Sequence, residues 1–188
     1  MSNRAKLIIF TGPSGVGKGT ILADFFKKTD KNIVYSISST TRQPRDGEIN
    51  GMHYFFISKE EFEKLIKEDA FLEYAQYSGN YYGTNKKFVE EKISEGKSVL
   101  LEIELQGALQ VMKKRPDAVT IFIKPPTFEE LEHRLRGRHT EKEEAIQKRL
   151  KAAKEELNNA DKFHYVIEND IVSRAVDELI SIYNKETK

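Results

Sequence analysis

Residues 8–20, IIFTGPSGVGKGT, constrain the fold of this chain more than any other stretch. An apolar run ends at Gly12, small residues follow, and Lys18 completes the spacing G-x-x-x-x-G-K that is typical of a phosphate-binding loop. Glycines let successive backbone N–H groups point at an anion, and a following helix adds the positive end of its dipole. Strand-like residues 6–10 and helix-like residues 21–26 give the order that this motif requires. The stretch predicts nucleotide binding, and a glycine-rich turn without a ligand is the alternative.

The composition narrows the class of protein. Of 188 residues, 38% are hydrophobic and 32% are charged, which predicts one globular α/β domain with a charged surface. The net charge of +1 argues against a general nucleic-acid or membrane-binding surface. The chain has no cysteine, its four histidines lack metal-ligand spacing, and no apolar run is long enough to span a membrane. We therefore expect a cytoplasmic protein without disulfides or directly bound metal.

Hydrophobic periodicity predicts a βα series with one interruption. Strands are expected at 6–10, 32–38, 53–57, 70–77, 98–103, 118–123 and 163–167, and helices at 85–95, 106–114, 127–138, 140–159 and 171–185. A further helix begins after Ser58, where Glu61 completes a capping box, and Thr140 with Glu143 forms another. The sum is an α/β fold of the P-loop NTPase type. Its parallel sheet has helices on both faces, a β-rich insertion and a basic helical hairpin.

Two groups of arginines are candidates for holding phosphate. Arg42 and Arg45 lie in a hydroxyl-rich loop, and Tyr54 and Tyr82 belong to the same insertion. Planar guanidinium forks beside phenol hydroxyls suit a phosphate monoester. The second group surrounds the junction of two helices and comprises Arg134, Arg136, Arg138 and Arg149. The alternatives are a solvated loop for the first group and ion pairs with neighbouring glutamates for the second.

Three glutamates stand where a carboxylate needs a partner or a ligand. Glu73 lies inside the apolar strand pattern FLEY. A carboxylate only accepts hydrogen bonds, guanine offers donors at N1 and N2, and adenine offers an acceptor at N1, so Glu73 would select guanine. Glu102 and Glu104 end a buried strand near the loop, where an acid can orient magnesium-bound water or neutralise an arginine. The alternatives are the solvent face of an edge strand for Glu73 and a structural partner of Arg42 or Lys18 for the other two.

With these residues assembled, the sequence resembles guanylate kinases over about residues 6–185. The matching motifs are GPSGVGK (12–18), STTRQPRDGE (39–48), GMHYFF (51–56), FLEYA (71–75), GNYYGT (79–84), EIELQG (102–107), PP (125–126), RLRGR (134–138) and ND (169–170). The resemblance implies Mg²⁺-dependent, in-line transfer of the ATP γ-phosphoryl group to GMP. It also implies one domain over 1–188, with a core at about 1–32, 85–126 and 160–188, a GMP-binding lobe at about 33–84 and a lid at about 127–159.

The resemblance implies a role for each matching position. ATP would be bound by Gly12, Pro13, Ser14, Gly15, Val16, Gly17, Lys18, Gly19 and Thr20, by Arg134 and Arg138 of the lid, and by Asn169 and Asp170 at adenine. GMP would be bound by Ser38, Glu73 and Thr84 at guanine, by Arg42, Arg45, Tyr54 and Tyr82 at phosphate, and by Glu102 and Glu104 between the nucleotides. The catalytic charges would be Lys18, Arg42, Arg138 and Arg149.

Two positions depart from the family pattern. Gly19 stands where many members have Ser or Thr, so Mg²⁺ bound with ATP would meet the protein through water near Thr20 and Glu102. His139 replaces a glycine that usually follows the lid arginine. The expected partners are ATP and GMP, with no nucleic acid and no membrane, and the oligomeric state stays open, a homodimer included. The alternatives are another nucleoside monophosphate kinase and a non-catalytic guanylate-kinase-like protein-binding module.

Overall fold

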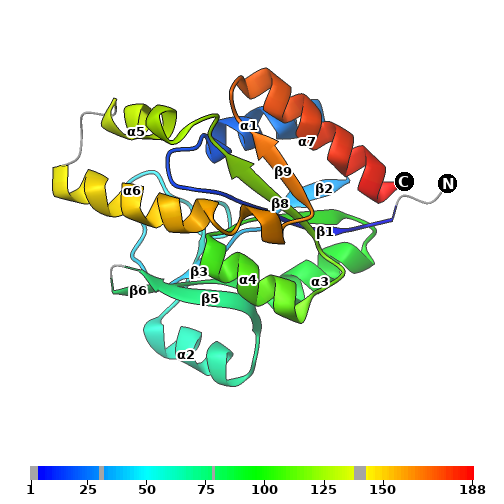
Figure 1. Ribbon diagram of the computed structural model, residues 1–188. Helices are drawn as coiled ribbons and strands as arrows, with labels where there is room; N and C mark the ends of the chain where they lie inside the picture. Colours follow the sequence, from blue (N-terminus) through cyan, green and yellow to red (C-terminus); the bar gives the residue numbers. More distant parts are fainter. Residues whose placement is uncertain (1–3, 30–31, 78, 138–142) are drawn as a thin grey trace.

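The computed structural model describes residues 4–29, 32–77, 79–137 and 143–188, which form a five-stranded sheet covered by helices and a separate four-stranded sheet (Figure 1). The larger sheet has the order β2-β7-β1-β8-β9, and all its strands are parallel. Its strands are β1 (Leu7–Thr11), β2 (Ile33–Tyr35), β7 (Ser98–Glu102), β8 (Val119–Lys124) and β9 (Tyr165–Glu168). The predicted α/β class with a parallel core is confirmed.

The central strands are nearly continuous in apolar residues because helices cover both faces of the sheet. Ile8 and Phe10 of β1 pack on one face, in the cluster that includes α1 (Lys18–Lys28) and α7 (Val172–Thr187). Leu7 and Ile9 point to the opposite face, toward α3 (Lys86–Ser94) and α4 (Leu105–Lys114). Figure 1 shows these two helical layers on either side of the sheet.

The basic helical hairpin consists of α5 (Phe128–Arg136) and α6 (Glu143–Leu157), and a short 3₁₀ turn, η1 (Ala160–Lys162), follows. Thr127 caps α5 as predicted, because its hydroxyl accepts a hydrogen bond from the backbone N–H of Glu130 at 3.1 Å. Thr140, the expected cap of α6, and His139 lie outside the described residues.

The smaller sheet has the order β4-β3-β6-β5. Its elements are β3 (Ser39–Thr40), β4 (Phe55–Phe56), β5 (Phe71–Tyr77) and β6 (Asn80–Asn85), with α2 (Lys59–Lys67) packed beside them. Ser58 caps α2 through the N–H of Glu61, as predicted. The ring of Phe62 on α2 stacks on Phe71 at 4.4 Å and on Tyr81 at 5.1 Å between centroids, which gives this sheet an aromatic core of its own.

Two elements differ from the sequence prediction. The strand expected at 32–38 is short, and Ile33–Tyr35 pairs with β7, so the start of the range expected for the lobe belongs to the larger sheet. β2 is an edge strand, buried at Ile33 and exposed at Tyr35. Its sequence therefore has the mixed pattern that is also expected of a half-exposed strand in the lobe. Residues 80–85 form β6, where only a polar turn was expected, because pairing with β3 and β5 on both sides overrides the low strand propensity of Asn and Gly.

Candidate active site

The loop between β1 and α1 lies at the carboxyl end of the parallel sheet and packs tightly against two distant segments. Gly15 and Gly17 have φ angles of 87° and 101°. A Cβ atom at Gly15 would lie 2.6 Å from Leu135 Cδ2, and one at Gly17 would lie 2.5 Å from Asn169 Nδ2. These positions need glycine for both backbone conformation and space, because α5 and the end of β9 close in on the loop.

Lys18, the first residue of α1, directs its ammonium group back into the loop. Lys18 Nζ donates to the carbonyl oxygen of Gly12 and, at 3.2 Å, to that of Pro13. Burial lowers the pKa of Lys18, and the negative charges of Glu102, Glu156 and Glu104 partly oppose this effect. The loop therefore holds a desolvated cation where a phosphate group would meet it.

Two predicted ATP-binding residues, Arg134 and Asn169, and the predicted catalytic Arg149 converge on the same loop. Arg134 donates to the carbonyl oxygens of Val16 (3.4 Å) and Asn169 (3.1 Å). Asn169 Nδ2 donates to Val16 O at 2.8 Å, and its Oδ1 is buried with no hydrogen-bond partner in the described part of the chain. Arg149 of α6 donates to the hydroxyl of Ser14 at 2.7 Å. The structure thus joins β1, α5, α6 and β9 around one phosphate-binding loop.

The remaining predicted residues of this half are placed differently. Asp170 is exposed, accepts a hydrogen bond from Ile171 N at 2.6 Å and pairs with Arg174 at 3.0 Å. Arg136 pairs with Glu132 at 2.8 Å and with Glu143 at 2.5 Å, as the ion-pair alternative expects. Arg138 lies outside the described residues.

A cavity of about 340 Å³ lies between the smaller sheet and the carboxyl end of β7. Its lining residues are Ser38, Tyr54, Glu73, Ala75, Tyr77, Tyr82, Glu102, Ile103, Glu104, Gln106 and Gly107. Many of the residues predicted for the acceptor nucleotide therefore meet in one place, although the sequence spreads them over four separate stretches. The volume suits a ligand of nucleotide size.

Glu73 is the buried acid of this cavity, with 6% of its surface exposed. Thr84 Oγ1 donates to Glu73 Oε1 at 2.6 Å, and a Cβ atom at Gly107 would lie 2.7 Å from Glu73 Oε2. Burial raises the pKa of Glu73, and the hydrogen bonds from Thr84 oppose that rise. The alternative that Glu73 occupies the solvent face of an edge strand is wrong. An inward-facing carboxylate of this kind suits a ligand that places hydrogen-bond donors in the cavity.

The arginine loop forms a second polar end near the cavity. Arg42 donates to both carboxylate oxygens of Glu48, at 2.9 and 2.8 Å, and Arg45 N donates to Glu48 at 2.7 Å. The guanidinium carbon of Arg42 lies 5.4 Å from the ring centroid of Tyr54, which packs edge-on against Tyr82. The sequence prediction missed Glu48, because six residues within a loop have no periodic spacing to signal a pair. Arg45 itself is exposed.

The Glu48→Gln variant tests this pair through the pH dependence of stability. Arg42, followed by the N–H of Arg45, lowers the pKa of Glu48 to about 2 from the ordinary 4.5. A lowered folded-state pKa stabilises the fold above the unfolded pKa, and that contribution is lost as the pH falls through about 4.5 to about 2. We expect the variant to unfold at a lower temperature than the wild type at pH 7, with the difference shrinking in acid. Thermal unfolding from pH 7 to pH 3 measures this, and a pH-independent difference would contradict the assignment.

Glu102 and Glu104 sit between the loop and the cavity. Tyr35 at the end of β2 donates its hydroxyl hydrogen to Glu102 Oε2 at 2.9 Å, a partner that the sequence prediction did not find. Burial and the neighbouring Glu102 raise the pKa of Tyr35, which keeps it a hydrogen-bond donor. Glu104 holds the N-cap position of α4 without capping it, and its side chain lines the cavity. Both acids are therefore placed between the two halves of the site.

The loop offers room for a hydrated cation but no cage of protein ligands. A Cβ atom at Gly19 would meet nothing within 4 Å, and Thr20 beside it is exposed. Within the described ranges, no group of three acidic or histidine side chains could hold a metal ion. Mg²⁺ keeps several waters and is usually held by one or two carboxylates together with substrate phosphates. The residues present thus fit an ion that arrives with a nucleotide.

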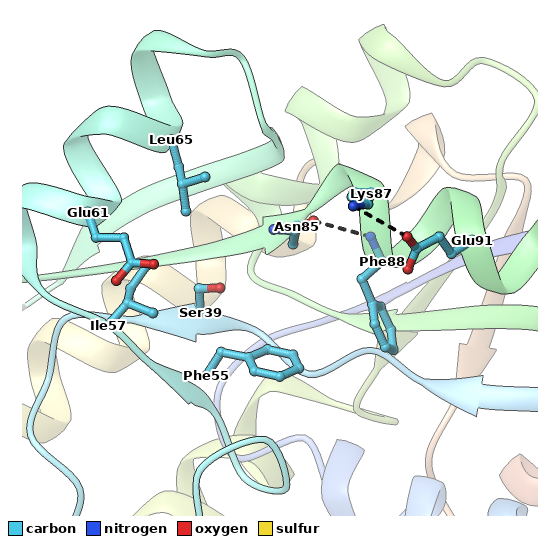
Figure 2. Close-up of a pocket in the computed structure, with 9 residues that line it drawn as sticks. All are labelled: Ser39, Phe55, Ile57, Glu61, Leu65, Asn85, Lys87, Phe88 and Glu91. Atoms are coloured by element: carbon cyan, nitrogen blue, oxygen red, sulfur yellow. Dashed lines mark hydrogen bonds and ion pairs between the residues drawn. The ribbon is translucent and has the colours of Figure 1, made fainter.

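A second cavity, of about 400 Å³, lies on the other side of β3 and is drawn in Figure 2. Phe55, Ile57, Leu65 and Phe88 form its apolar lining, and Lys87 stands near Glu91 at its edge. None of the predicted site residues lines it. Its single cation, Lys87, is paired, so this cavity lacks the positive charges that a phosphate ester needs.

No helix in the described part of the chain is long and apolar enough to cross a membrane.

Comparison with known proteins gives one consistent family. The sequence profile of the guanylate kinase family matches residues 4–186. A guanylate kinase of Streptococcus thermophilus (strain CNRZ 1066) is 51% identical over 186 residues, covering 99% of this chain and 89% of that protein. One from Caldanaerobacter subterraneus subsp. tengcongensis is 53% identical over 176 residues, covering 94% and 85%. The crystal structure of guanylate kinase from Anaplasma phagocytophilum aligns with a TM-score of 0.76 at 33% identity, covering 100% of this chain and 89% of that one.

Proposed function

The chain belongs to the guanylate kinase family and is an ATP:GMP phosphotransferase, and from this premise we propose how its residues divide the reaction between them. The alternative of a non-catalytic binding module is set aside, because the match to curated guanylate kinases extends over nearly the whole length of this chain and most of theirs. The proposal keeps one domain with a core, a GMP-binding lobe at about 33–84 and a lid at about 127–159. A cytoplasmic location is part of it, supported by the absence of cysteine from the sequence.

The donor half would hold ATP at the loop of residues 12–20. The position of Lys18 supports this: its ammonium group points into the loop and donates to the carbonyl oxygens of Gly12 and Pro13, and a phosphate oxygen bound in the loop would accept from it in their place. Arg134, Asn169 and Asp170 would lie on the adenine side of the loop, and Arg138 would act from the proposed lid. Mg²⁺ would be held by the ATP phosphates and would reach the protein through water near Thr20 and Glu102. When bound, it supplies positive charge that neutralises the phosphates.

The acceptor half would hold GMP in the cavity beside β5. Glu73 would accept hydrogen bonds from guanine N1 and N2, with Thr84 and Ser38 completing the base site. Arg42, Arg45, Tyr54 and Tyr82 would hold the phosphate, and Glu102 and Glu104 would lie between the two nucleotides. The observation that carries this assignment is the buried, inward-facing Glu73 carboxylate, oriented by Thr84 at 2.6 Å.

The chemistry needs no strong base. The attacking oxygen belongs to an already ionised phosphate, and the transition state spreads charge over the oxygens of the transferring group. The rate enhancement would come from alignment of the two nucleotides and from the charges of Lys18, Arg42, Arg138 and Arg149. Arg149 already reaches the loop through Ser14, which supports its placement beside the transferring group. Closure of the lid and lobe would exclude water and so prevent hydrolysis of ATP.

A coupled ADP-release assay tests this proposal directly. We expect turnover with ATP·Mg²⁺ and GMP and little with AMP, CMP, UMP or dTMP, and the same assay measures whether dGMP is accepted. Excess EDTA should stop the reaction, and added Mg²⁺ should restore it, because the ion accompanies the nucleotide. An enzyme that ignored GMP but accepted AMP or a pyrimidine nucleotide would overturn the base assignment and favour another nucleoside monophosphate kinase.

A further inference from the structure

The strand that carries Glu73 lies at the end of its sheet. In the order β4-β3-β6-β5, which covers the described residues, β5 has a strand neighbour on one edge only. An unpaired edge leaves backbone N–H and C=O groups without partners. Helix α4 of the core covers this edge, and Figure 1 shows it lying alongside β5.

A glutamine on α4 takes the place of the missing strand. Gln110 Oε1 accepts a hydrogen bond from Tyr74 N at 3.3 Å, and Gln110 Nε2 donates to Tyr74 O at 3.2 Å. One side-chain amide therefore makes both hydrogen bonds that a neighbouring strand would make at this residue. Tyr74 directly follows Glu73, so this amide holds the peptide next to the buried acid.

Two more residues on the same face of α4 extend the contact. Gly107, three positions before Gln110, is the residue against which the Glu73 carboxylate packs. Lys114, four positions after it, donates to Phe71 O at 2.9 Å and pairs with Asp69 at 3.3 Å. Residues spaced by three and four share one face of a helix. The α4 stripe, defined as Gly107, Gln110 and Lys114, thus contacts β5 on both sides of Glu73.

The pairing of β5 with β6 is irregular next to Glu73. The register between β5 and β6 shifts between Phe71 and Glu73, which marks an irregularity of the bulge type. A bulge disrupts the ladder locally and changes the direction of the side chains beside it. The direction of the Glu73 side chain therefore depends on contacts from both edges of β5, with Thr84 on β6 holding the carboxylate and Gln110 on α4 holding the backbone beside it.

We propose that Gln110 is a positioning residue for base selection: by holding the Tyr74 peptide, it fixes the direction in which the Glu73 carboxylate enters the cavity. This inference rests on the proposed role of Glu73 as the group that binds guanine. Gln110 touches no reacting atom in this arrangement. Its contribution belongs to GMP binding and selectivity, and not to the charge balance of phosphoryl transfer.

The test is the Gln110→Met variant, which keeps the length of the side chain and removes both hydrogen bonds. We expect KM for GMP to rise about tenfold, which corresponds to about 1.4 kcal/mol. KM for ATP and the kcat at saturating GMP should stay within about twofold, and the preference for GMP over AMP should fall. The matched control is Gln147→Met, because Gln147 is an exposed glutamine on α6 that bonds Glu143. It should resemble the wild type.

A second variant guards against misfolding. Gln110→Asn keeps the amide but is one methylene too short to reach both atoms of Tyr74, and it should raise KM for GMP in the same way. Unchanged KM for GMP in folded variants, or an equal loss toward GMP and ATP, overturns the inference. Failure of the wild-type protein to phosphorylate GMP would instead overturn the proposed function, so the two failures are distinguishable.

Discussion

Replacement of Lys18 by methionine is expected to lower kcat for ATP and GMP by about 10²–10³-fold, the range observed when one preorganised donor is removed from an active site. Methionine has a similar volume but no charge, so the loop keeps its packing and loses the cation that would neutralise the transferring phosphoryl group. The ammonium group is desolvated, and a charge in such a place interacts more strongly with a phosphate than one in water. Steady-state kinetics with both substrates measure the loss.

The matched control for this experiment is Lys27→Met. Lys27 is an exposed residue of the last turn of the same helix, far from the loop in sequence, and its substitution should leave kcat unchanged. Circular dichroism and thermal unfolding of both variants establish that the fold is retained. A Lys18→Met enzyme that keeps kcat within a few-fold of the wild type would remove this residue from the catalytic machinery.

The second large effect is expected for Glu73→Gln, with a fall of about 10²–10³-fold in kcat/KM for GMP. Two hydrogen bonds to a charged acceptor, each contributing about 1.5–3 kcal/mol, are replaced by one neutral acceptor and a donor that faces the donors of guanine. Thr84 can still donate to the remaining oxygen, so the side chain should keep its position. Activity toward AMP should be unchanged or higher. Equal losses for GMP and AMP would show that Glu73 does not discriminate between bases.

The same variant removes a pH dependence. Because burial raises the pKa of Glu73, the carboxyl group of the empty site takes up a proton at a higher pH than an ordinary glutamate. A raised folded-state pKa favours the fold at low pH, and this contribution is lost as the pH rises through that pKa. A protonated carboxyl group can no longer accept both hydrogen bonds from guanine N1 and N2, so KM for GMP should rise as the wild-type enzyme is acidified. Glu73→Gln should lack this step and retain only the one due to the GMP phosphate, which titrates near pH 6.

The sequence predicts local features of this molecule well and distant pairings poorly. The phosphate-binding loop, the capped helices and the apolar strands depend on neighbouring residues, so their patterns are visible along the chain. Glu73 could be singled out because a charge interrupted an apolar strand. The contacts of Glu48 with Arg42, of Tyr35 with Glu102 and of Gln110 with Tyr74 join residues without periodic spacing, and only the folded arrangement reveals them.

The second arginine group illustrates the same limit. The sequence left open whether these side chains bind an anion or neighbouring glutamates. Arg134 pairs with Glu130 at 2.8 Å and also donates to a backbone carbonyl oxygen of the phosphate-binding loop, which neither option predicted. Arg136 is engaged in ion pairs alone among the contacts described. Residues two positions apart on a helix point in different directions, so Arg134 faces the phosphate-binding loop while Arg136 faces Glu132 and Glu143.

Glu48 orders the side chain of Arg42, which we propose holds the GMP phosphate, before GMP arrives. An arginine side chain that waited free in solvent would lose most of its rotamer freedom on binding, and that entropy loss would weaken affinity. Glu48 already holds the guanidinium plane against Tyr54, so this freedom is lost during folding and not during each encounter. In the proposed role of Arg42, each incoming nucleotide would meet a side chain that is already ordered, so the order acquired when the chain folds would serve every catalytic cycle afterwards.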